Sequence, residues 1–367
     1  MATRTGAETG ATVTALDGEG VAGDPGWRTA VKTVPRHRFV PRGRRGGPPV
    51  SSSTLPSSAV RMWSDAEVVE GHTILQVGTG SGYATALACE RLGSSHVTSV
   101  DIDPRRLDVA ANALYDCGYT PTLAVADGRY GYWPEAWFDR IVTACSFRSV
   151  PQTLLAQTRP GGKVLLQLSG WLGGHARVLL TVSEDGAAEG SLLPSTVSFT
   201  SARTLTPPVF GHPADWTAGL TAQARSTQHS PKRITASTAE ASVLRFLVQC
   251  SLPSAQLLMN GGAVHLIDVV SGSAASLVPE GDSWRVREGG PMNLWERIEQ
   301  LVSAFDAAGR PGAEHFVLCV DQGKQHVRWA HAPVAPVPLP RADPDFDLAL
   351  LKGVDLTVRP KREARGR

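Results

Sequence analysis

Strand-like and helix-like segments alternate regularly between residues 74 and 169, and this alternation constrains the fold more than any other feature of the sequence. Short apolar runs are followed by stretches in which apolar residues recur every three or four positions. The expected strands are ILQV (74–77), HVTSVDI (96–102), PTLAVA (121–126), FDRIVTAC (138–145) and KVLLQLS (163–169). The expected helices span 83–93, 104–118 and 150–158. Strands and helices that repeat at intervals of about 25 residues predict a parallel, doubly wound α/β sheet.

The pattern changes after Pro207 and Pro208, which predicts a second, smaller unit. That unit combines an amphipathic helix (293–309) with a strand pair around Gln322-Gly323, so we expect an α+β module. The segment ASVLRFLVQC at its start fits either a strand or a short helix. We divide the chain into a disordered arm (1–26), an α/β domain (27–204), a linker (205–240), an α+β extension (241–335) and a mobile tail (336–367).

Composition excludes several classes of protein. Apolar residues make up 42% of the 367 residues, which is enough for a buried core and excludes a wholly disordered chain. With 36 Lys and Arg against 34 Asp and Glu, the chain lacks the basic excess of a dedicated nucleic-acid binder. There is no apolar run long enough for a membrane span or a signal peptide, and the five Cys are scattered. We therefore expect a soluble, cytoplasmic protein with reduced thiols and no nucleic-acid or membrane partner.

An apolar strand that runs directly into a glycine-rich turn is the most informative local motif. The turn is GTGSG, formed by Gly78, Thr79, Gly80, Ser81 and Gly82. Glycines let a backbone turn sharply and approach a ligand closely, and the N-terminus of the helix that follows favours an anion. The G-x-G-x-G spacing differs from the G-x-G-x-x-G of dinucleotide-binding turns, which disfavours a nicotinamide-dependent oxidoreductase.

Acidic residues stand at the ends of the next two strands. Asp101, followed by Ile102, ends the second strand, where a carboxylate can hold ribose hydroxyls. Asp127-Gly128 follows the third strand, where a ligand at this edge of the sheet would place its base. Each element alone is commonly a tight turn or a solvated strand end. In this order on consecutive strand–helix units, they predict S-adenosyl-L-methionine as the ligand.

Other types of active site find no support in the sequence. There is no P-loop motif, and Thr79 stands where a G-x-S-x-G hydrolase turn needs its first glycine. The ten His are dispersed without an H-E-x-x-H motif, so no metal site is predicted. The basic run from Arg36 to Arg45 is expected to be a solvated loop, and the alternative is a landing surface for an acidic peptide.

Several motifs follow each other in the order typical of protein-L-isoaspartate O-methyltransferases. They are VPRHRFVP (34–41), Thr54-Leu55-Pro56, ILQVGTGSGYATALA (74–88), HVTSVDIDP (96–104), DGRYG (127–131), FDRIVTAC (138–145) and QTRPGGKVLL (157–166). Over residues 30–200 the chain resembles this family, which implies a Rossmann-like class I S-adenosylmethionine-dependent methyltransferase sheet. In the extension, EGGPMNLWERIEQ and HVRW resemble homologues found beside ATP-grasp ligases and lanthipeptide synthetases in ribosomal peptide pathways.

The family resemblance assigns roles to individual residues. Thr54, with Ser53 as its substitute, would lie near the methyl donor and the acceptor as the catalytic residue. The cofactor would be bound by Gly78, Thr79, Gly80, Ser81, Gly82, Asp101, Ile102, Asp127, Gly128 and Thr143. Among these, the glycine motif would line the methionine end, Asp101 the ribose, and Asp127 with Gly128 the adenine. The acceptor would be an Asp or isoAsp carboxylate of a peptide or protein, which is ionised at neutral pH and needs no general base.

Three departures from the family pattern bear on activity. Gln76 stands where the family usually has an acidic residue, and Thr54 replaces the commoner Ser. The segment 42–50 is shorter than the one that helps to enclose the isoaspartyl peptide in repair enzymes. These departures disfavour isoaspartate repair more than methyl transfer, and they also admit a weakened or inactive enzyme.

Three functions therefore stay open. The first is a carboxyl O-methyltransferase acting on an Asp of a ribosomally synthesised, modified peptide, whose methyl ester leads to a succinimide (aspartimide). The second is the housekeeping isoaspartyl repair enzyme, and the third is a non-catalytic cofactor- or peptide-binding partner. We expect the extension to contribute peptide recognition, so that deleting 241–367 abolishes activity on a precursor peptide but spares cofactor affinity.

Overall fold

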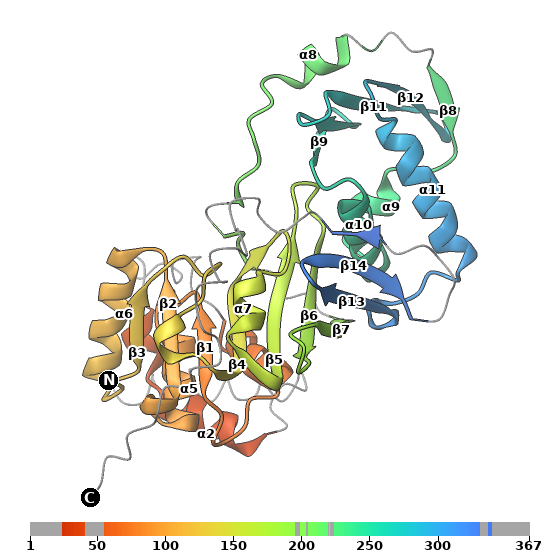
Figure 1. The fold of residues 1–367 in the computed structure, drawn as a ribbon. Helices are drawn as coiled ribbons and strands as arrows, with labels where there is room; N and C mark the ends of the chain where they lie inside the picture. The colour runs from red at the N-terminus through yellow and green to blue at the C-terminus, as the bar shows by residue number, and fades with distance from the viewer. Residues whose placement is uncertain are drawn as a thin grey trace, which may run out of the picture.

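A computed structural model describes residues 24–40, 55–194, 199–202, 205–218, 220, 224–330 and 337–339. These residues form two β-sheets, one of ten strands and one of five, with helices packed against them (Figure 1). The ten-stranded sheet contains the α/β pattern predicted from the sequence, and the five-stranded sheet lies in the second half of the chain.

The main sheet has the strand order β15-β14-β13-β7-β6-β5-β4-β1-β2-β3. Its parallel part consists of β1 (Ile74–Val77), β2 (Val97–Asp101), β3 (Thr122–Val125), β4 (Phe138–Phe147) and β5 (Thr158–Ser169). Two antiparallel strands, β6 (His175–Val182) and β7 (Ala188–Leu193), continue it beyond β5. The predicted Rossmann-like α/β class is confirmed, and the complete sheet is mixed.

The helices of the first half begin and end where local sequence signals favour it. They are α2 (Pro25–Thr33), α3 (Arg36–Phe39), α4 (Pro56–Asp65), α5 (Tyr83–Leu92), α6 (Pro104–Asp116) and α7 (Gln152–Ala156), with 3₁₀ turns at Ser94–His96 and Trp133–Glu135. In α6, the Asp103 carboxylate accepts from the Arg105 amide over 3.1 Å, and Pro104 occupies the first turn. Gly118, with φ of +84°, then ends the helix.

The five-stranded sheet is antiparallel, with the order β8-β12-β11-β10-β9. Its strands are β8 (Arg225–Thr227), β9 (Ala255–Asn260), β10 (Ala263–Asp268), β11 (Ser273–Glu280) and β12 (Ser283–Gly289). The accompanying helices are α8 (Pro213–Ala218), α9 (Lys232–Thr235), α10 (Ala239–Ser251) and α11 (Leu294–Ala307). The ambiguous segment ASVLRFLVQC is helical, in α10. The predicted linker contains α8, β8 and α9, because β8 has a partner distant in sequence, β12, that local patterns do not reveal.

The last hairpin of the extension belongs to the main sheet. After a 3₁₀ turn at Ala313–His315, β13 (Phe316–Asp321) and β14 (Lys324–Trp329) form the pair predicted around Gln322-Gly323. β13 pairs with β7, and β14 pairs with β15 (Val337–Pro338). Figure 1 shows this blue hairpin beside the yellow-green strands β6 and β7. Covering the edge of β7 satisfies backbone groups that an open sheet edge would leave unpaired.

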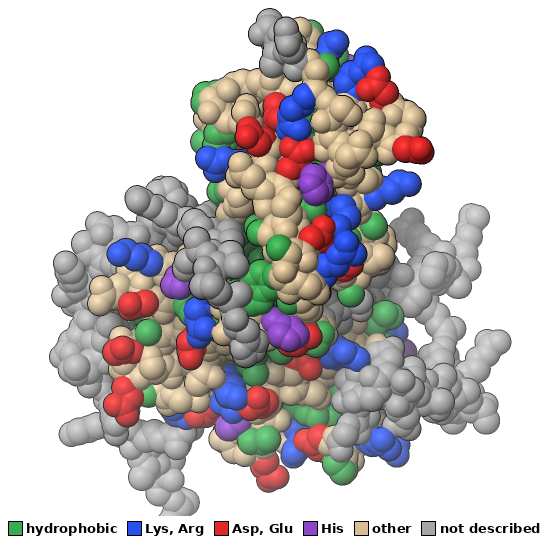
Figure 2. All heavy atoms as spheres, turned by 90° about the vertical axis from the view of Figure 1, so that its right-hand side faces the viewer, with side chains coloured by type: hydrophobic (Ala, Val, Ile, Leu, Met, Phe, Trp, Pro, Cys, Tyr) green, Lys and Arg blue, Asp and Glu red, His purple; other side chains and the backbone are tan. Residues whose placement is uncertain are grey.

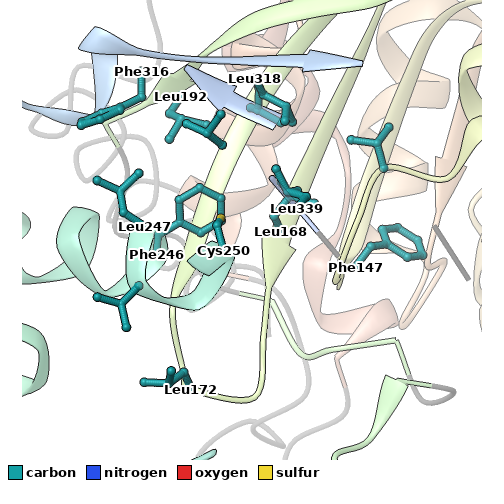
Figure 3. Packing of buried hydrophobic residues seen from close by; sticks show 14 of the residues in the cluster. Phe147, Leu168, Leu172, Leu192, Phe246, Leu247, Cys250, Phe316, Leu318 and Leu339 are labelled. Atoms are coloured by element: carbon teal, nitrogen blue, oxygen red, sulfur yellow. The ribbon is translucent and has the colours of Figure 1, made fainter. Parts of the chain in front are cut away.

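One apolar core crosses the boundary predicted at residue 241. Figure 3 shows Phe147, Leu168 and Leu192 from the α/β part packed with Phe246 of α10 and Phe316 of β13. All five side chains are at least 97% buried, and they belong to one continuous cluster. The two halves of the chain therefore share a core.

Charged side chains on the surface are mixed in sign. On the face seen in Figure 2, Lys and Arg are interspersed with Asp and Glu over the extension, which gives that face no patch of one sign. Across the described ranges, no helix combines the length and apolar character needed to cross a bilayer.

Candidate active site

The glycine-rich turn connects β1 to α5 in the way the sequence predicts. β1 is buried along its whole length, and the amides of Gly78 and Thr79 both donate to the Val100 carbonyl, over 2.8 and 3.2 Å. Gly78, Gly80 and Gly82 have φ values of +95°, +57° and +83°, a region that other residues enter only with strain. The turn thus requires glycine at all three positions.

The three glycines have different surroundings. A Cβ on Gly78 would lie 3.3 Å from Ala144 Cβ, and one on Gly82 would lie 3.1 Å from Ala110 Cβ. A Cβ on Gly80 would meet no atom within 4 Å. The outer glycines therefore let the turn pack closely on β4 and α6, while the middle one leaves backbone open to a ligand.

Asp101 holds this turn against the end of β2. Its Oδ2 accepts a 2.9 Å hydrogen bond from the Gly80 amide, and its Oδ1 accepts a 3.0 Å bond from the Asp103 amide. A carboxylate has about four acceptor sites, so two stay available for hydroxyl groups. Ile102, the next residue, keeps 40% of its surface exposed and offers an apolar contact beside the carboxylate.

Thr79 and Ser81, both predicted to contact the cofactor, use their hydroxyls within the protein. Thr79 Oγ1 lies 2.7 Å from Ser99 Oγ, and both residues are buried. Ser81 Oγ accepts from the Tyr83 amide over 3.4 Å at the start of α5. Their side chains brace the turn, so a ligand would meet them through their backbone atoms.

The Asp127-Gly128 turn lies against the end of β1. A Cβ on Gly128 would come within 2.1 Å of Val77 Cγ1, which explains the glycine. The Asp127 carboxylate is engaged by Arg129: Nε and Nη2 each lie 3.0 Å from Oδ2, and the Arg129 amide donates to Oδ1 over 3.0 Å. The sequence prediction placed Asp127 at the cofactor and missed this arginine, because an acidic strand end does not specify its partner.

The end of β4 completes the arrangement. Thr143 pairs with Val77, is 2% exposed, and its hydroxyl has no hydrogen-bond partner among the described residues. Burial, together with the negative charges of Asp101 and Asp127, raises the pKa of the Cys145 thiol to about 12. The ends of β1, β2, β3 and β4 therefore bring the glycine turn, both carboxylates and the Thr143 hydroxyl into one region.

Gln76 replaces an expected acid with a neutral side chain whose nitrogen and oxygen each make one hydrogen bond. It is 1% exposed, its Nε2 donates to the Gly78 carbonyl over 2.9 Å, and its Oε1 accepts from Thr85 Oγ1 over 2.9 Å. The amide thus links the turn to α5 and places no charge there. Gln76 is a structural brace for the glycine turn.

A cluster of three hydroxyls near this region escapes sequence reasoning. Ser146 Oγ lies 2.6 Å from Ser169 Oγ, which lies 3.1 Å from Ser201 Oγ. The cluster sits where the register of β4 and β5 shifts between Val142 and Ser146, and where Ser201 forms an isolated bridge to Ser146. No local signal brings Ser201 to the end of β4.

The two predicted catalytic residues, Thr54 and Ser53, lie outside the described residues, as does the segment 42–50. The description resumes at Leu55, and α4 begins at Pro56. This helix is anchored by Trp63, whose Nε1 donates to the Ala84 carbonyl over 3.1 Å and whose ring stacks on Trp27. Within the described ranges, no group of three His, Cys, Asp or Glu residues could hold a metal ion.

Comparisons with known proteins place this chain in a family. The family model for protein-L-isoaspartate(D-aspartate) O-methyltransferase matches residues 8–171. The protein-L-isoaspartate O-methyltransferase of Methanosarcina mazei is 30% identical over 171 residues, which cover 44% of this chain and 69% of that protein. The Thermococcus onnurineus enzyme is 33% identical over 174 residues, which cover 44% of this chain and 77% of that protein.

A solved structure of a protein-L-isoaspartate O-methyltransferase has the same fold, with a TM-score of 0.53 at 18% identity. The match covers 88% of this chain and 99% of that chain, so the likeness in fold continues beyond the methyltransferase half. The predicted cofactor, S-adenosyl-L-methionine, is the methyl donor of this family. The chain belongs to the protein-L-isoaspartate O-methyltransferase family.

Proposed function

We propose that this protein is an S-adenosyl-L-methionine-dependent O-methyltransferase that esterifies the side-chain carboxylate of an isoaspartyl or aspartyl residue in a peptide or protein. The observation that carries the proposal is the Asp101 carboxylate, bonded to the Gly80 amide at the end of β2. The hydrogen bond thus connects the carboxylate that we assign to the ribose with the glycine turn, at the residue whose surroundings leave space for a ligand.

The residues at the strand ends fit the cofactor. Asp101 has two free acceptor sites for ribose hydroxyls, and Ile102 offers an exposed apolar side chain for the adenine. Asp127 Oδ1 carries one hydrogen bond and can accept a second from an amino group. The buried Thr143 hydroxyl lacks a partner among the described residues, as expected of a group that a ligand completes.

S-adenosyl-L-methionine would supply an electrophilic methyl group on a sulfonium. The chain has to bind the acceptor carboxylate, align it with that methyl group and remove its water shell. No general base is needed, because a carboxylate with a pKa near 4 is ionised at neutral pH. We assign Thr54, with Ser53 as substitute, to hydrogen-bond the acceptor, because Thr54-Leu55-Pro56 matches the Ser/Thr-x-Pro motif of the family.

Two acceptor classes fit this chemistry. An isoaspartyl residue in damaged protein is the acceptor named for the relatives, and we place it first. An Asp of a ribosomally made, modified peptide is the narrower alternative, supported by the resemblance of the 241–335 extension. A solved protein-L-isoaspartate O-methyltransferase matches 88% of this chain in fold. The presence of the extension is therefore a weak argument against a role in repair. Either ester would cyclise to a succinimide when the next backbone amide nitrogen attacks the ester carbonyl and methanol leaves.

Methyl transfer from labelled cofactor to three short peptides tests the proposal. The peptides share one sequence and carry isoaspartate, aspartate or asparagine at one position. We expect base-labile label in the isoaspartyl peptide, none in the asparagine peptide, and a loss of at least about tenfold in rate with Thr54→Ala, which removes a hydrogen bond to a charged group. Transfer to aspartate alone would favour peptide maturation.

Calorimetric titration of the cofactor is the companion measurement. Cofactor binding without methyl transfer to any of the three peptides or to a candidate precursor peptide would support a non-catalytic binding partner instead. Binding of NADH, followed by its fluorescence, would point to an oxidoreductase.

A further inference from the structure

The segment that follows β4 is held by a residue far away in the sequence. We call residues 148–151, between β4 and α7, the β4–α7 loop. Val150 in this loop is fully buried, and both of its backbone polar groups bond to one side chain, that of Gln325 on β14. The Val150 amide donates to Gln325 Oε1 over 2.8 Å, and Gln325 Nε2 donates to the Val150 carbonyl over 2.7 Å.

The start of the same loop is held by a second contact from the carboxyl-terminal half. The Arg148 guanidinium lies 3.6 Å from the ring centre of Trp171, and its Nη2 donates to the Pro253 carbonyl over 2.6 Å. Pro253 lies between α10 and β9, and Gln249 of α10 bonds both to its carbonyl and to the Leu172 amide. Both ends of the loop are thus fixed by residues beyond position 240.

These contacts matter because Val150 is buried within the loop. A buried amide or carbonyl without a partner is costly, so the Val150 backbone depends on Gln325 for its position. Gln325 is 6% exposed and lies on the hairpin that β13 attaches to the main sheet. The loop conformation is therefore coupled to the presence of the last hairpin.

The loop lies on the acceptor side of the proposed site. The residues assigned to the adenine, ribose and methionine portions follow β3, β2 and β1, which are consecutive in the sheet. The methyl end of the cofactor would then point toward β4, the next strand, which carries Thr143 opposite Val77 and ends at Phe147, just before the loop. We therefore expect the β4–α7 loop to border the acceptor, whereas the residues assigned to the ribose and adenine follow β2 and β3, beyond β1.

We propose that the carboxyl-terminal part of the chain shapes the acceptor side of the methyl-transfer site by clamping the β4–α7 loop, with Gln325 and Arg148 as positioning residues. This inference rests on the proposed function. In this proposal the extension affects catalysis by fixing the β4–α7 loop, and the extension itself need not contact the acceptor.

Gln325→Ala in the full-length protein tests the clamp, and Gln256→Ala is the matched control. Gln256 is also 6% exposed, and its Nε2 bonds the Pro208 carbonyl within the carboxyl-terminal half. For Gln325→Ala we expect amide hydrogen exchange of residues 148–150 to rise about tenfold and kcat/KM for the isoaspartyl peptide to fall about tenfold, the change that corresponds to about 1.4 kcal/mol. Cofactor Kd should stay within about twofold, and the control should match wild type in all three measurements.

Arg148→Lys provides a second, milder variant, because it keeps the charge but loses the planar stack on Trp171. We expect it to change exchange and peptide kinetics in the same direction and to leave the cofactor Kd unchanged. Equal losses of peptide kcat/KM and cofactor affinity in both variants would overturn the proposal, as would faster exchange of the loop with unaltered kinetics. If wild type methylates no peptide, the proposed function fails, and unchanged loop exchange in Gln325→Ala separately refutes the clamp.

Discussion

The backbone amide of Gly80 donates a 2.9 Å hydrogen bond to the carboxylate of Asp101, which ties the open part of the glycine turn to the end of β2. The same carboxylate accepts from the Asp103 amide over 3.0 Å. Asp101 therefore both shapes the turn and presents its remaining acceptor sites beside it. This double role can be separated by a substitution that keeps one oxygen.

Asp101→Asn should weaken binding of S-adenosyl-L-methionine by at least about tenfold, because the amide loses the charge and one acceptor. Its one oxygen can replace the acceptor of either the Gly80 or the Asp103 amide but not both, so we also expect a loss of stability of about 1–3 kcal/mol. Asp103→Asn is the control, since Asn caps a helix as well as Asp does and Asp103 caps α6. Isothermal titration calorimetry measures both, and equal affinities for the two variants would exclude Asp101 from the ribose site.

Gly128→Ala should destabilise the protein by about 1–3 kcal/mol, because the added Cβ would lie 2.1 Å from Val77 Cγ1. Adding Val77→Ala removes the clashing methyl groups, so the double variant should be more stable than the sum of the single effects predicts. We expect a coupling energy of at least about 1 kcal/mol from urea unfolding of all four proteins. Additive effects would show that the Asp127-Gly128 turn does not press on β1.

Stability should fall as the pH rises above 9. Burial raises the pKa values of Cys89 and Cys145 from 9.0 to about 12, and it raises that of Cys250 as well. Between pH 9 and about pH 12, the thiols of the unfolded chain lose their protons while the buried thiols of the folded chain keep them. Deprotonation therefore favours unfolding. The stabilisation is complete below pH 9 and is lost as pH approaches 12.

Urea unfolding between pH 7 and pH 11 checks this prediction, and Cys145→Ala provides the comparison. The variant should show a shallower decline above pH 9, because it lacks one of the raised thiols. A profile identical to that of wild type would mean that Cys145 ionises at its ordinary pKa in the folded protein.

The ion pair between the buried Arg177 and the partly exposed Asp65 should contribute to the anchoring of α4. The pair spans 2.6 Å, and the Arg177 side chain is 3% exposed. Asp65→Ala should lower the free energy of unfolding by about 1–3 kcal/mol, because the buried Arg177 guanidinium loses this carboxylate, whose own side chain is 32% exposed. Adding Arg177→Met should restore much of that loss.

The exposed pair Arg285–Glu280 is the control for this measurement, with side chains 53% and 44% exposed. Glu280→Ala should change stability by less than about 1 kcal/mol. Thermal and urea unfolding give both values, and a loss in Asp65→Ala no larger than that in Glu280→Ala would contradict the prediction. Because α4 directly follows Thr54, Asp65→Ala should also lower the methyl-transfer rate.

The parts of the fold that are determined by residues close together in the sequence could be predicted from the sequence. Apolar periodicity located β1 to β5, and the glycine motif with Asp101 indicated the cofactor end of the sheet. Long-range pairing could not be predicted, because alternation along β13 shows which face is buried but not that its partner is β7. The contact of Arg129 with Asp127 and the meeting of Ser201 with Ser146 likewise depend on tertiary structure.

The attachment of β13 to β7 has a consequence for biosynthesis. The sheet begins at residue 74, but the strand that covers β7 spans Phe316–Asp321, so most of the chain must leave the ribosome before this edge is covered. Until then the nascent chain exposes an unpaired strand and the apolar residues that α10 and β13 later bury, which makes it prone to aggregation. Its folding is correspondingly slowed by the large sequence separation of the closing contacts. Completion of this part of the sheet therefore has to wait until β13 has been synthesised.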